Sequence, residues 1–454
     1  MRYIEGKPLN EPATLSWRTE QGNTGVEFSG YQYIIAKLIQ SGVNQKYLPF
    51  VYRFLTFSIF YTALFFLLYS ILDKEKWLYK GLFFLGLISS PLLLYYGYNF
   101  LPDMLGLSLI LWCFYLFNKD FEKYFYLILL ISGLSLLIKT SSGIYFISFM
   151  AVYFLRYWNK WNKKLIFGGI IFASIGGAVA YYDIFIVNGR NTIYNSYVFL
   201  SNTMPTKSWS EFIQIFDTAS RFTGDYFNGA QRILIALLVL VGITRIKTIS
   251  FKNKNTQIFI LIFLGLLSIL LLFGVQYMNH DYYVIGTFMP ITLYFIIKGV
   301  AYISEYIHPR TSLLLAGVFA ITSFSIANQK YFNRMSEHVW INGYREVYYR
   351  NWLIGAENKI DKLIAKDDLV FSVYSPEPNL PLVYLNRKGI TLNTEEMGRK
   401  GDPFGWLMKY HKTKYVICNS RFVNSFERDQ PDFIANSTVI YQDSQFLLYQ
   451  TNGY

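Results

Sequence analysis

The sequence contains little charge, four histidines and two cysteines. Only 16% of its 454 residues are Asp, Glu, Lys or Arg, whereas 53% are hydrophobic and 19% are aromatic. This composition argues against an ordinary soluble globular protein and is typical of an integral membrane protein. Cys113 lies in an apolar run and Cys418 in the polar C-terminal part, which argues against a disulfide framework or a cysteine-based metal site.

The excess of positive charge, +13 in total, is not arranged as a basic surface interleaved with aromatic residues. Nucleic-acid binding is therefore not indicated. The Lys and Arg residues instead lie in short linkers between apolar runs, which the positive-inside rule explains. Residues 1–25 are polar and have no apolar core, so no cleavable signal peptide is recognised. We expect a multi-pass protein of the bacterial inner membrane.

Ten apolar runs are long enough to cross, or nearly cross, a bilayer. They cover residues 50–72, 80–98, 103–118, 124–138, 142–157, 164–187, 232–246, 257–274, 282–298 and 312–327. Linkers rich in Lys and Arg alternate with short linkers whose single basic residue is Lys139. The basic linkers are predicted to be cytoplasmic and the others extracytoplasmic. The sequence thus predicts a polytopic α-helical membrane protein with about ten membrane helices.

The same alternation places three polar segments on the extracytoplasmic side. These are residues 1–49, a large loop at about 188–231, and residues 328–454, which flank and interrupt the multi-span region 50–327. The first segment is predicted to contain an amphipathic helix lying along the membrane surface. Because a polar tail is translocated more easily after a preceding helix, we expect that the chain lacks a first membrane helix.

The C-terminal segment differs in pattern from the rest of the chain. Short strands are predicted at 370–375, 414–420 and 437–450, and amphipathic helices at 351–366 and 402–412. Alternation of these elements predicts a small extracytoplasmic α/β domain.

One carboxylate stands out in the stretch YNFLPDMLGLSLILW, residues 98–112. Asp103 lies at the outer end of an apolar run, directly after Pro102. Pro followed by Asp is an ordinary helix-start signal. An ionisable residue at the edge of a membrane segment also indicates a functional site, and the two interpretations are compatible.

Other ionisable residues fall on the same predicted face. His280 and Asp281 open another apolar run, where Asn279 or Asp281 could cap a helix. Alternatively, His280 and Asp281 could supply an acid/base pair, whereas two ligands alone are weak support for a metal site. Lys139 could extend to the membrane surface or bind a lipid phosphate. Glu27 precedes the predicted interfacial helix as either a solvated or a functional carboxylate.

Several short motifs resemble the lipid-dependent glycosyltransferases of the GT-C fold. The resemblance is to glycosyltransferase family 39, which includes aminoarabinose transferases and protein O-mannosyltransferases. The motifs are EFSGYQYIIAKL followed by YLPFVYRFL, then NFLPDMLGLSLIL, GLSLLIKTSSG and NHDYYVIGTFMPI. The resemblance implies an inverting transfer of a sugar from a polyprenyl-phosphate donor to a lipid, glycan or protein acceptor on the extracytoplasmic side.

The resemblance also implies residue roles. A carboxylate takes the acceptor proton, and cations or amide donors hold the departing phosphate. Phe28 stands where the family has a lysine after its glutamate, so phosphate binding falls to another group such as Lys139. No cofactor is expected and no metal site is assigned. The predicted catalytic residues are Asp103, Glu27, His280 and Asp281, and the predicted substrate-binding residues are Lys139, Tyr282 and Tyr283.

Two other functions remain compatible with the sequence. A transporter or flippase of lipid-linked glycans would place charged residues near the bilayer midplane on interrupted helices. A non-catalytic membrane binding protein would follow if the family's first helix and its catalytic Asp are missing.

Overall fold

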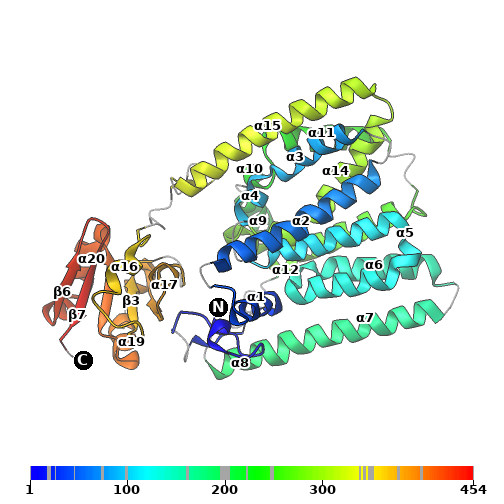
Figure 1. The fold of residues 1–454 in the computed structure, drawn as a ribbon. Coiled ribbons are helices and arrows are strands. Elements are labelled where there is room, and N and C mark those ends of the chain that lie inside the picture. Colours follow the sequence, from blue (N-terminus) through cyan, green and yellow to red (C-terminus); the bar gives the residue numbers. More distant parts are fainter. Residues whose placement is uncertain are drawn as a thin grey trace. The chain divides into compact units, whose positions relative to one another are not determined.

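The chain forms two compact units in the computed structural model (Figure 1). The helical unit comprises Glu27–Ile184 and Leu200–Tyr344, and the α/β unit comprises Met1–Val26, Phe185–Phe199 and Arg345–Tyr454. The structure describes residues 2–17, 22–25, 27–44, 47–72, 76–97, 101–159, 163–194, 205–220, 223–245, 250–336, 339–340, 344–345, 352–375, 379–398 and 402–452. Residues 98–100 of the predicted outer linker and 195–204 of the predicted large loop lie outside this set.

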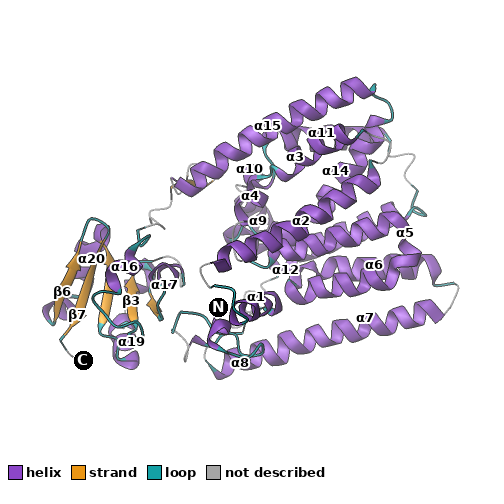
Figure 2. Cartoon of the chain, viewed as in Figure 1, coloured by secondary structure: helices purple, strands orange, loops and turns teal. Residues whose placement is uncertain are grey.

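The helical unit is built of α-helices, shown in purple in Figure 2. Among the described residues these are α1 (Gly30–Gln40), α2 (Leu48–Ile71), α3 (Trp77–Ile88), α4 (Pro91–Gly97), α5 (Asp103–Ile138), α6 (Gly143–Tyr157), α7 (Lys163–Tyr181), α9 (Trp209–Ser220), α10 (Thr223–Tyr226), α11 (Gly229–Thr244), α12 (Lys254–Asn279), α13 (Tyr283–Gly286), α14 (Phe288–Ser304) and α15 (Pro309–Ser336). A π-helical turn, Tyr182–Val187, follows α7 and leads into α8 (Asn188–Ile193).

Helix α5 is a hairpin of two antiparallel helices rather than one long rod. Its backbone leaves the helical conformation at Asp120. Ser135 Oγ donates a hydrogen bond to Gly106 O, 29 residues away, at 3.1 Å, although a straight helix would separate these residues by roughly 43 Å. The fold-back agrees with the two separate runs, 103–118 and 124–138, predicted from the sequence. It also brings the first and last residues of α5 close together.

The structure has fewer helices that are long and apolar enough to cross a membrane than the ten spans predicted from the sequence. Within the described part of the chain, five helices are long and apolar enough, or six if α3 and α4 form one span. The predicted run 80–98 is bent by 77° between these two helices. Pro91 begins α4 and cannot donate the backbone hydrogen bond that a continuous helix would require there.

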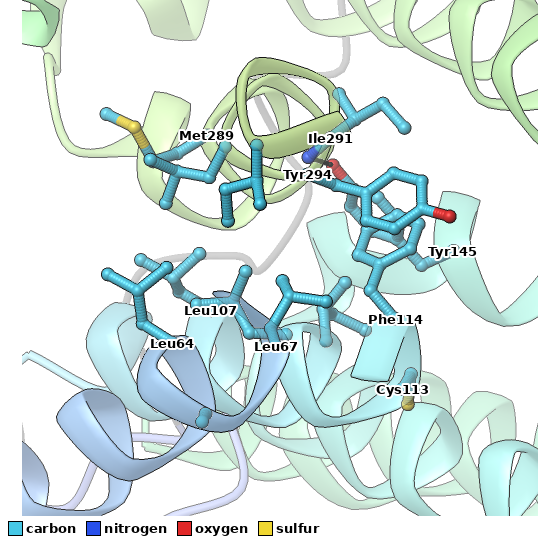
Figure 3. Packing of buried hydrophobic residues seen from close by; sticks show 14 of the residues in the cluster. Leu64, Leu67, Leu107, Cys113, Phe114, Tyr145, Met289, Ile291 and Tyr294 are labelled. Atoms are coloured by element: carbon cyan, nitrogen blue, oxygen red, sulfur yellow. Dashed lines mark hydrogen bonds between the residues drawn. The ribbon is translucent and has the colours of Figure 1, made fainter. Parts of the chain in front are cut away.

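The core of the helical unit is a layer of aliphatic and aromatic side chains from α2, α5, α6 and α14 (Figure 3). Phe114 stacks on Tyr294 with ring centroids 4.4 Å apart. The Tyr145 hydroxyl accepts a hydrogen bond from the backbone N–H of Ile291 at 3.3 Å and donates one to the carbonyl of Thr287. Tyr145 thereby satisfies backbone groups where the chain breaks between α13 and α14, as burial in lipid requires.

The α/β unit contains a five-stranded sheet of order β4-β3-β5-β7-β6. Strand β3 pairs in parallel with β4 and β5, and β7 pairs antiparallel with β5 and β6. The elements of the α/β unit are α16 (Ala356–Ile360), β3 (Val370–Val373), α17 (Leu380–Leu385), β4 (Gly389–Thr391), α18 (Thr394–Met397), α19 (Pro403–His411), β5 (Tyr415–Asn419), α20 (Val423–Asp429), α21 (Pro431–Ala435), β6 (Ser437–Gln442) and β7 (Phe446–Thr451). A separate two-stranded sheet of β1 (Val339–Trp340) and β2 (Tyr344–Arg345) lies at the end of the helical unit, where the chain passes into the α/β unit.

The α/β unit contains elements that the sequence pattern does not predict, namely strand β4 and helices α17, α18, α20 and α21. The helix predicted at 351–366 is reduced to α16, because Gly355 adopts a left-handed conformation immediately before it. Strand β4 is three residues long. The backbone of β4 pairs with the N-terminal segment, since Trp17 N–H donates to Gly389 O at 2.6 Å.

Because α3 packs closely against α15, alanine substitutions at two glycines of α3 are expected to have different effects on stability. A β-carbon at Gly86 would overlap the ring of Phe319 on α15, whereas one at Gly81 would meet no atom within 4 Å. We expect Gly86→Ala to destabilise the purified protein by roughly 1–3 kcal/mol through overpacking. Gly81→Ala should be neutral or stabilising because alanine favours the helix. Thermal unfolding in detergent measures both, and equal midpoints would contradict this packing.

Candidate functional site

The centre of the candidate site is the ammonium group of Lys139, which follows the last residue of α5. Its Nζ lies 3.3 Å from Asp103 Oδ1 and 3.1 Å from Glu27 Oε2. Asp103 begins α5, so the hairpin at Asp120 brings these two residues together. Glu27 arrives from the segment that precedes α1. Three residues that are far apart in the sequence therefore form one ion-pair cluster.

The two carboxylates of the cluster differ in exposure. The side chain of Asp103 is 1% exposed and that of Lys139 is 5% exposed, whereas that of Glu27 is 21% exposed. Only Glu27 of the three therefore presents a substantial surface to an incoming molecule. Asp103 lies behind Lys139 as a buried counter-charge.

Burial and neighbouring charges shift the pKa values of Glu27 and Lys139 in opposite directions. Burial raises the pKa of the Glu27 carboxyl, while the Lys139 ammonium and the Thr140 backbone N–H partly offset that rise. Burial by itself would lower the pKa of Lys139, but the carboxylates of Asp103 and Glu27 together raise the pKa above its usual value. Glu27 is thus a better proton acceptor than an exposed glutamate, and Lys139 remains charged.

Two tyrosines and two glycines surround the Lys139 side chain. The ammonium lies 5.6 Å from the ring centre of Tyr282 and 4.9 Å from that of Tyr283, within the range of cation–π attraction. A β-carbon at Gly106 or at Gly286 would lie 3.4 Å from a carbon of Lys139. These glycines allow α5 and α13 to pack closely around the lysine.

His280 and Asp281 lie in the turn between α12 and α13. Asp281 is 1% exposed and accepts a hydrogen bond from the hydroxyl of Tyr96 on α4. The His280 ring lies 5.2 Å from that of Tyr282. Burial lowers the pKa of His280, with Asp281 opposing and Lys139 reinforcing the effect. The structure therefore brings both residues to the aromatic side of the cluster, while the side chain of Asn279 lies outside the described set.

Asp183 is a further buried carboxylate that the sequence interpretation missed. It is 6% exposed and accepts a hydrogen bond from Thr140 Oγ1 at 3.4 Å. It lies in the π-helical turn Tyr182–Val187, a conformation often found at functional sites. An acidic residue within the apolar run 164–187 was the feature of the sequence that could have identified Asp183. Thr140 connects Asp183 to Glu27, because its backbone N–H also binds the Glu27 carboxylate.

The described residues have no group of three or more His, Cys, Asp or Glu side chains suited to hold a metal ion. Each carboxylate of the cluster instead contacts an ammonium, a hydroxyl or a backbone N–H. The arrangement provides one accessible carboxylate beside one buried cation. Chemically, it can accept a proton and stabilise an anion at neighbouring positions.

The fold is similar to that of solved membrane-bound sugar transferases, as the resemblance to the GT-C fold in the sequence predicts. ArnT from Cupriavidus metallidurans bound to undecaprenyl phosphate aligns with 92% of this chain and 86% of its own, with a TM-score of 0.55 and 9% identity. Its apo state aligns with 92% and 85%, with a TM-score of 0.57 and 10% identity.

The Archaeoglobus fulgidus oligosaccharyltransferase in complex with Zn and sulfate aligns with 99% of this chain and 68% of its own. Its TM-score is 0.56 at 10% identity. No family model and no curated protein sequence matches the chain. At such low identity the likeness establishes the fold, and the chemistry must be argued from the residues of this chain.

The cluster predicts a large stability cost for removing its cation. Lys139→Met would leave the Asp103 carboxylate buried without its counter-charge, so we expect a loss of roughly 3–5 kcal/mol. Lys37→Met on α1 is the control, because Lys37 is exposed. Thermal unfolding in detergent measures both variants. The double variant Asp103→Asn/Lys139→Met should recover part of the loss, and a Lys139→Met protein as stable as the control would contradict the assignment.

Proposed function

We propose that this chain is an integral membrane glycosyltransferase. It transfers a sugar from a polyprenyl-phosphate donor to an acceptor hydroxyl at the extracytoplasmic face of the bacterial inner membrane, with inversion at the anomeric carbon. The observation that carries the proposal is the partly exposed Glu27 carboxylate beside the buried Lys139 ammonium, within a GT-C fold. A likeness to ArnT bound to undecaprenyl phosphate supports the class of donor.

In the proposed reaction Glu27 is the general base. Its carboxylate takes the proton of the acceptor hydroxyl, and the acceptor oxygen attacks the anomeric carbon from the face opposite the phosphate. The bond between the anomeric carbon and the phosphate oxygen breaks, and the phosphate leaves with the electron pair. Exposure supports Glu27 over Asp103 in this role, because the Asp103 side chain is 1% exposed and that of Glu27 is 21% exposed.

Lys139 couples proton transfer to departure of the phosphate. Before the reaction its charge is shared between Glu27 and Asp103. Once Glu27 accepts a proton it becomes neutral, so more of the lysine's positive potential is available to the developing phosphate charge. Asp103 remains as the buried partner that orients Lys139, which makes it a positioning residue.

The aromatic side of the cluster is proposed to hold the sugar. Tyr282 and Tyr283 form a stacked pair, with ring centroids 5.0 Å apart, next to Lys139. Burial lowers the pKa of His280 and so favours its neutral form, in which one ring nitrogen donates and the other accepts a hydrogen bond to a sugar hydroxyl. Asp281 positions this turn through Tyr96 rather than contacting the substrate.

Transfer from a panel of radiolabelled polyprenyl-phosphate sugars tests the proposal in membranes that contain equal amounts of each protein. We expect Glu27→Gln to lower the rate by about 10²–10⁴-fold, the usual contribution of a general base. Asp103→Asn should also lower it, since Lys139 loses its orientation. Asp120→Asn is the control, because Asp120 is exposed at the turn of the α5 hairpin.

Three results would contradict parts of this proposal. Wild-type rates in Glu27→Gln would exclude Glu27 as the base. Movement of a lipid-linked glycan across the bilayer without transfer would favour a flippase. A correctly inserted wild-type chain that transfers no sugar from any donor would favour a non-catalytic binding protein.

The raised pKa of Glu27 predicts an acid limb in the pH profile of transfer. Below this pKa the carboxyl is protonated and cannot accept the acceptor proton, so the rate should fall about tenfold per pH unit. Because burial raises the pKa above the usual value of about 4.3, the fall should begin closer to neutrality than for an exposed glutamate. Measurement of kcat/KM from pH 4 to 8 checks this. A flat profile down to pH 4.5 would contradict a raised pKa.

A further inference from the structure

A groove between α5 and α7 contains both apolar side chains and lysines. Helix α7 lies at the edge of the helical unit (Figure 1), and the segment Lys163–Ile193 is long and apolar enough to cross a membrane. The groove has a volume of about 440 Å³, within the size range of small-molecule sites. Its lining residues are Tyr126 on α5 and Lys163, Lys164, Ile166, Phe167 and Ile170 on α7.

The contact between α5 and α7 shapes the groove. The two helices approach closely where Gly168 meets Phe125, since a β-carbon at Gly168 would lie 2.5 Å from the Phe125 ring. Beside this contact, the Tyr126 ring packs edge-on against Phe167 with centroids 5.4 Å apart. The Tyr126 hydroxyl donates a hydrogen bond to the Lys164 carbonyl at 3.2 Å. Tyr126 therefore ties the lysine end of the groove to α5.

The apolar residues of the groove form a stripe along α7 that ends in a cation. Ile166, Phe167 and Ile170 are each more than half exposed. Lys163 lies one helical turn before Ile166 and Phe167, so it continues the same stripe. A phospholipid has matching parts, because its acyl chain packs on an apolar surface and its phosphate is attracted by basic side chains.

The groove lies at the other end of α5 from the ion-pair cluster. Tyr126 follows the hairpin turn at Asp120, whereas the cluster joins Asp103 and Lys139 at the open end of the hairpin. The proposed transfer reaction therefore does not account for the groove. The alternation of basic linkers predicts that this end is cytoplasmic, the side on which basic pockets between membrane helices bind anionic headgroups.

The charge around the lysine end favours an anionic headgroup. Both lysines of the groove are exposed. The sequence that joins α6 to α7, residues 158–162, contains one lysine and no Asp or Glu. The carboxylates at the turn of the α5 hairpin, Asp120 and Glu122, interact electrostatically with Lys254 on α12. Basic side chains thus predominate where the apolar stripe ends.

We infer that this groove binds an anionic phospholipid of the membrane. One acyl chain lies along Ile166, Phe167 and Ile170, and Lys163 and Lys164 hold the phosphate. A zwitterionic phospholipid can occupy the same apolar stripe, but the positive group of its headgroup is repelled by the lysines. The groove therefore selects lipids by the charge of the headgroup.

Native mass spectrometry of the full chain in detergent tests this site with defined lipids. The probes are phosphatidylglycerol, phosphatidylcholine with the same acyl chains, a polyprenyl phosphate and inorganic phosphate. We expect phosphatidylglycerol to bind more tightly than phosphatidylcholine. The double variant Lys163→Ala/Lys164→Ala should reduce this preference roughly tenfold or more, since each basic residue near an anionic lipid contributes about fivefold in affinity. Inorganic phosphate should not displace phosphatidylglycerol, because it makes no contact with the apolar stripe.

Lys76→Ala/Lys252→Ala is the matched control. These two exposed lysines precede α3 and α12 on the same predicted side of the membrane, and they lie outside the lining of the groove. The control removes the same charge from the chain, so it should keep the preference for phosphatidylglycerol. Both double variants alter exposed side chains and should keep the wild-type unfolding midpoint in detergent.

Four results would overturn the inference. The first is equal binding of the two phospholipids by the wild type, and the second is an equal loss of preference in both double variants. Displacement of phosphatidylglycerol by inorganic phosphate would indicate an ion site only. Tighter binding of the polyprenyl phosphate that is lost in Lys163→Ala/Lys164→Ala would indicate a site for the donor lipid. Because no sugar transfer is measured, this inference can fail while the transfer reaction stands, and the reverse also holds.

Discussion

A single buried ammonium that is shared by two carboxylates constrains much of the helical unit. Lys139 can be charged inside this structure only because Asp103 and Glu27 lie within 3.3 Å of it. The pairing of Lys139 with Asp103 requires α5 to fold back on itself. Its pairing with Glu27 requires the segment before α1 to lie against the open end of the α5 hairpin. Gly106 and Gly286 lie against the lysine side chain, where a β-carbon would be in van der Waals contact with it.

Breaks in the helices are compensated by side chains, as a membrane interior demands. Tyr145 binds backbone groups between α13 and α14, and Tyr277 donates to the Thr287 hydroxyl at the same break. Between α3 and α4, Ser90 donates to the carbonyl of Tyr226. A further break, between α12 and α13, carries Asp281 and Tyr282, and Tyr283 begins α13. Rigid hydrogen-bonded breaks therefore position polar residues without leaving backbone groups exposed to lipid.

The charge balance of the cluster explains how one site could handle both a proton and a phosphate. Lys139 pairs with Glu27 and Asp103, which in turn interact electrostatically with Asp183 and Asp281 respectively. This excess of carboxylates by itself repels an anion. In the proposed reaction, proton uptake by Glu27 would remove one negative charge when negative charge develops on the phosphate. Under this proposal, proton transfer and charge compensation depend on the same proton.

The sequence by itself determined that the chain is a helical membrane protein, where its apolar runs lie, and which charged residues are unusual. Those properties depend on composition and on local periodicity. Tertiary structure alone decided that Asp103, Lys139 and Glu27 form one cluster, because their pairing depends on the α5 hairpin rather than on sequence spacing. It also decided the difference in exposure between the two carboxylates and the hydrogen bond of Asp183 with Thr140. Each of these results from packing between segments that are distant in the chain, which local pattern cannot encode.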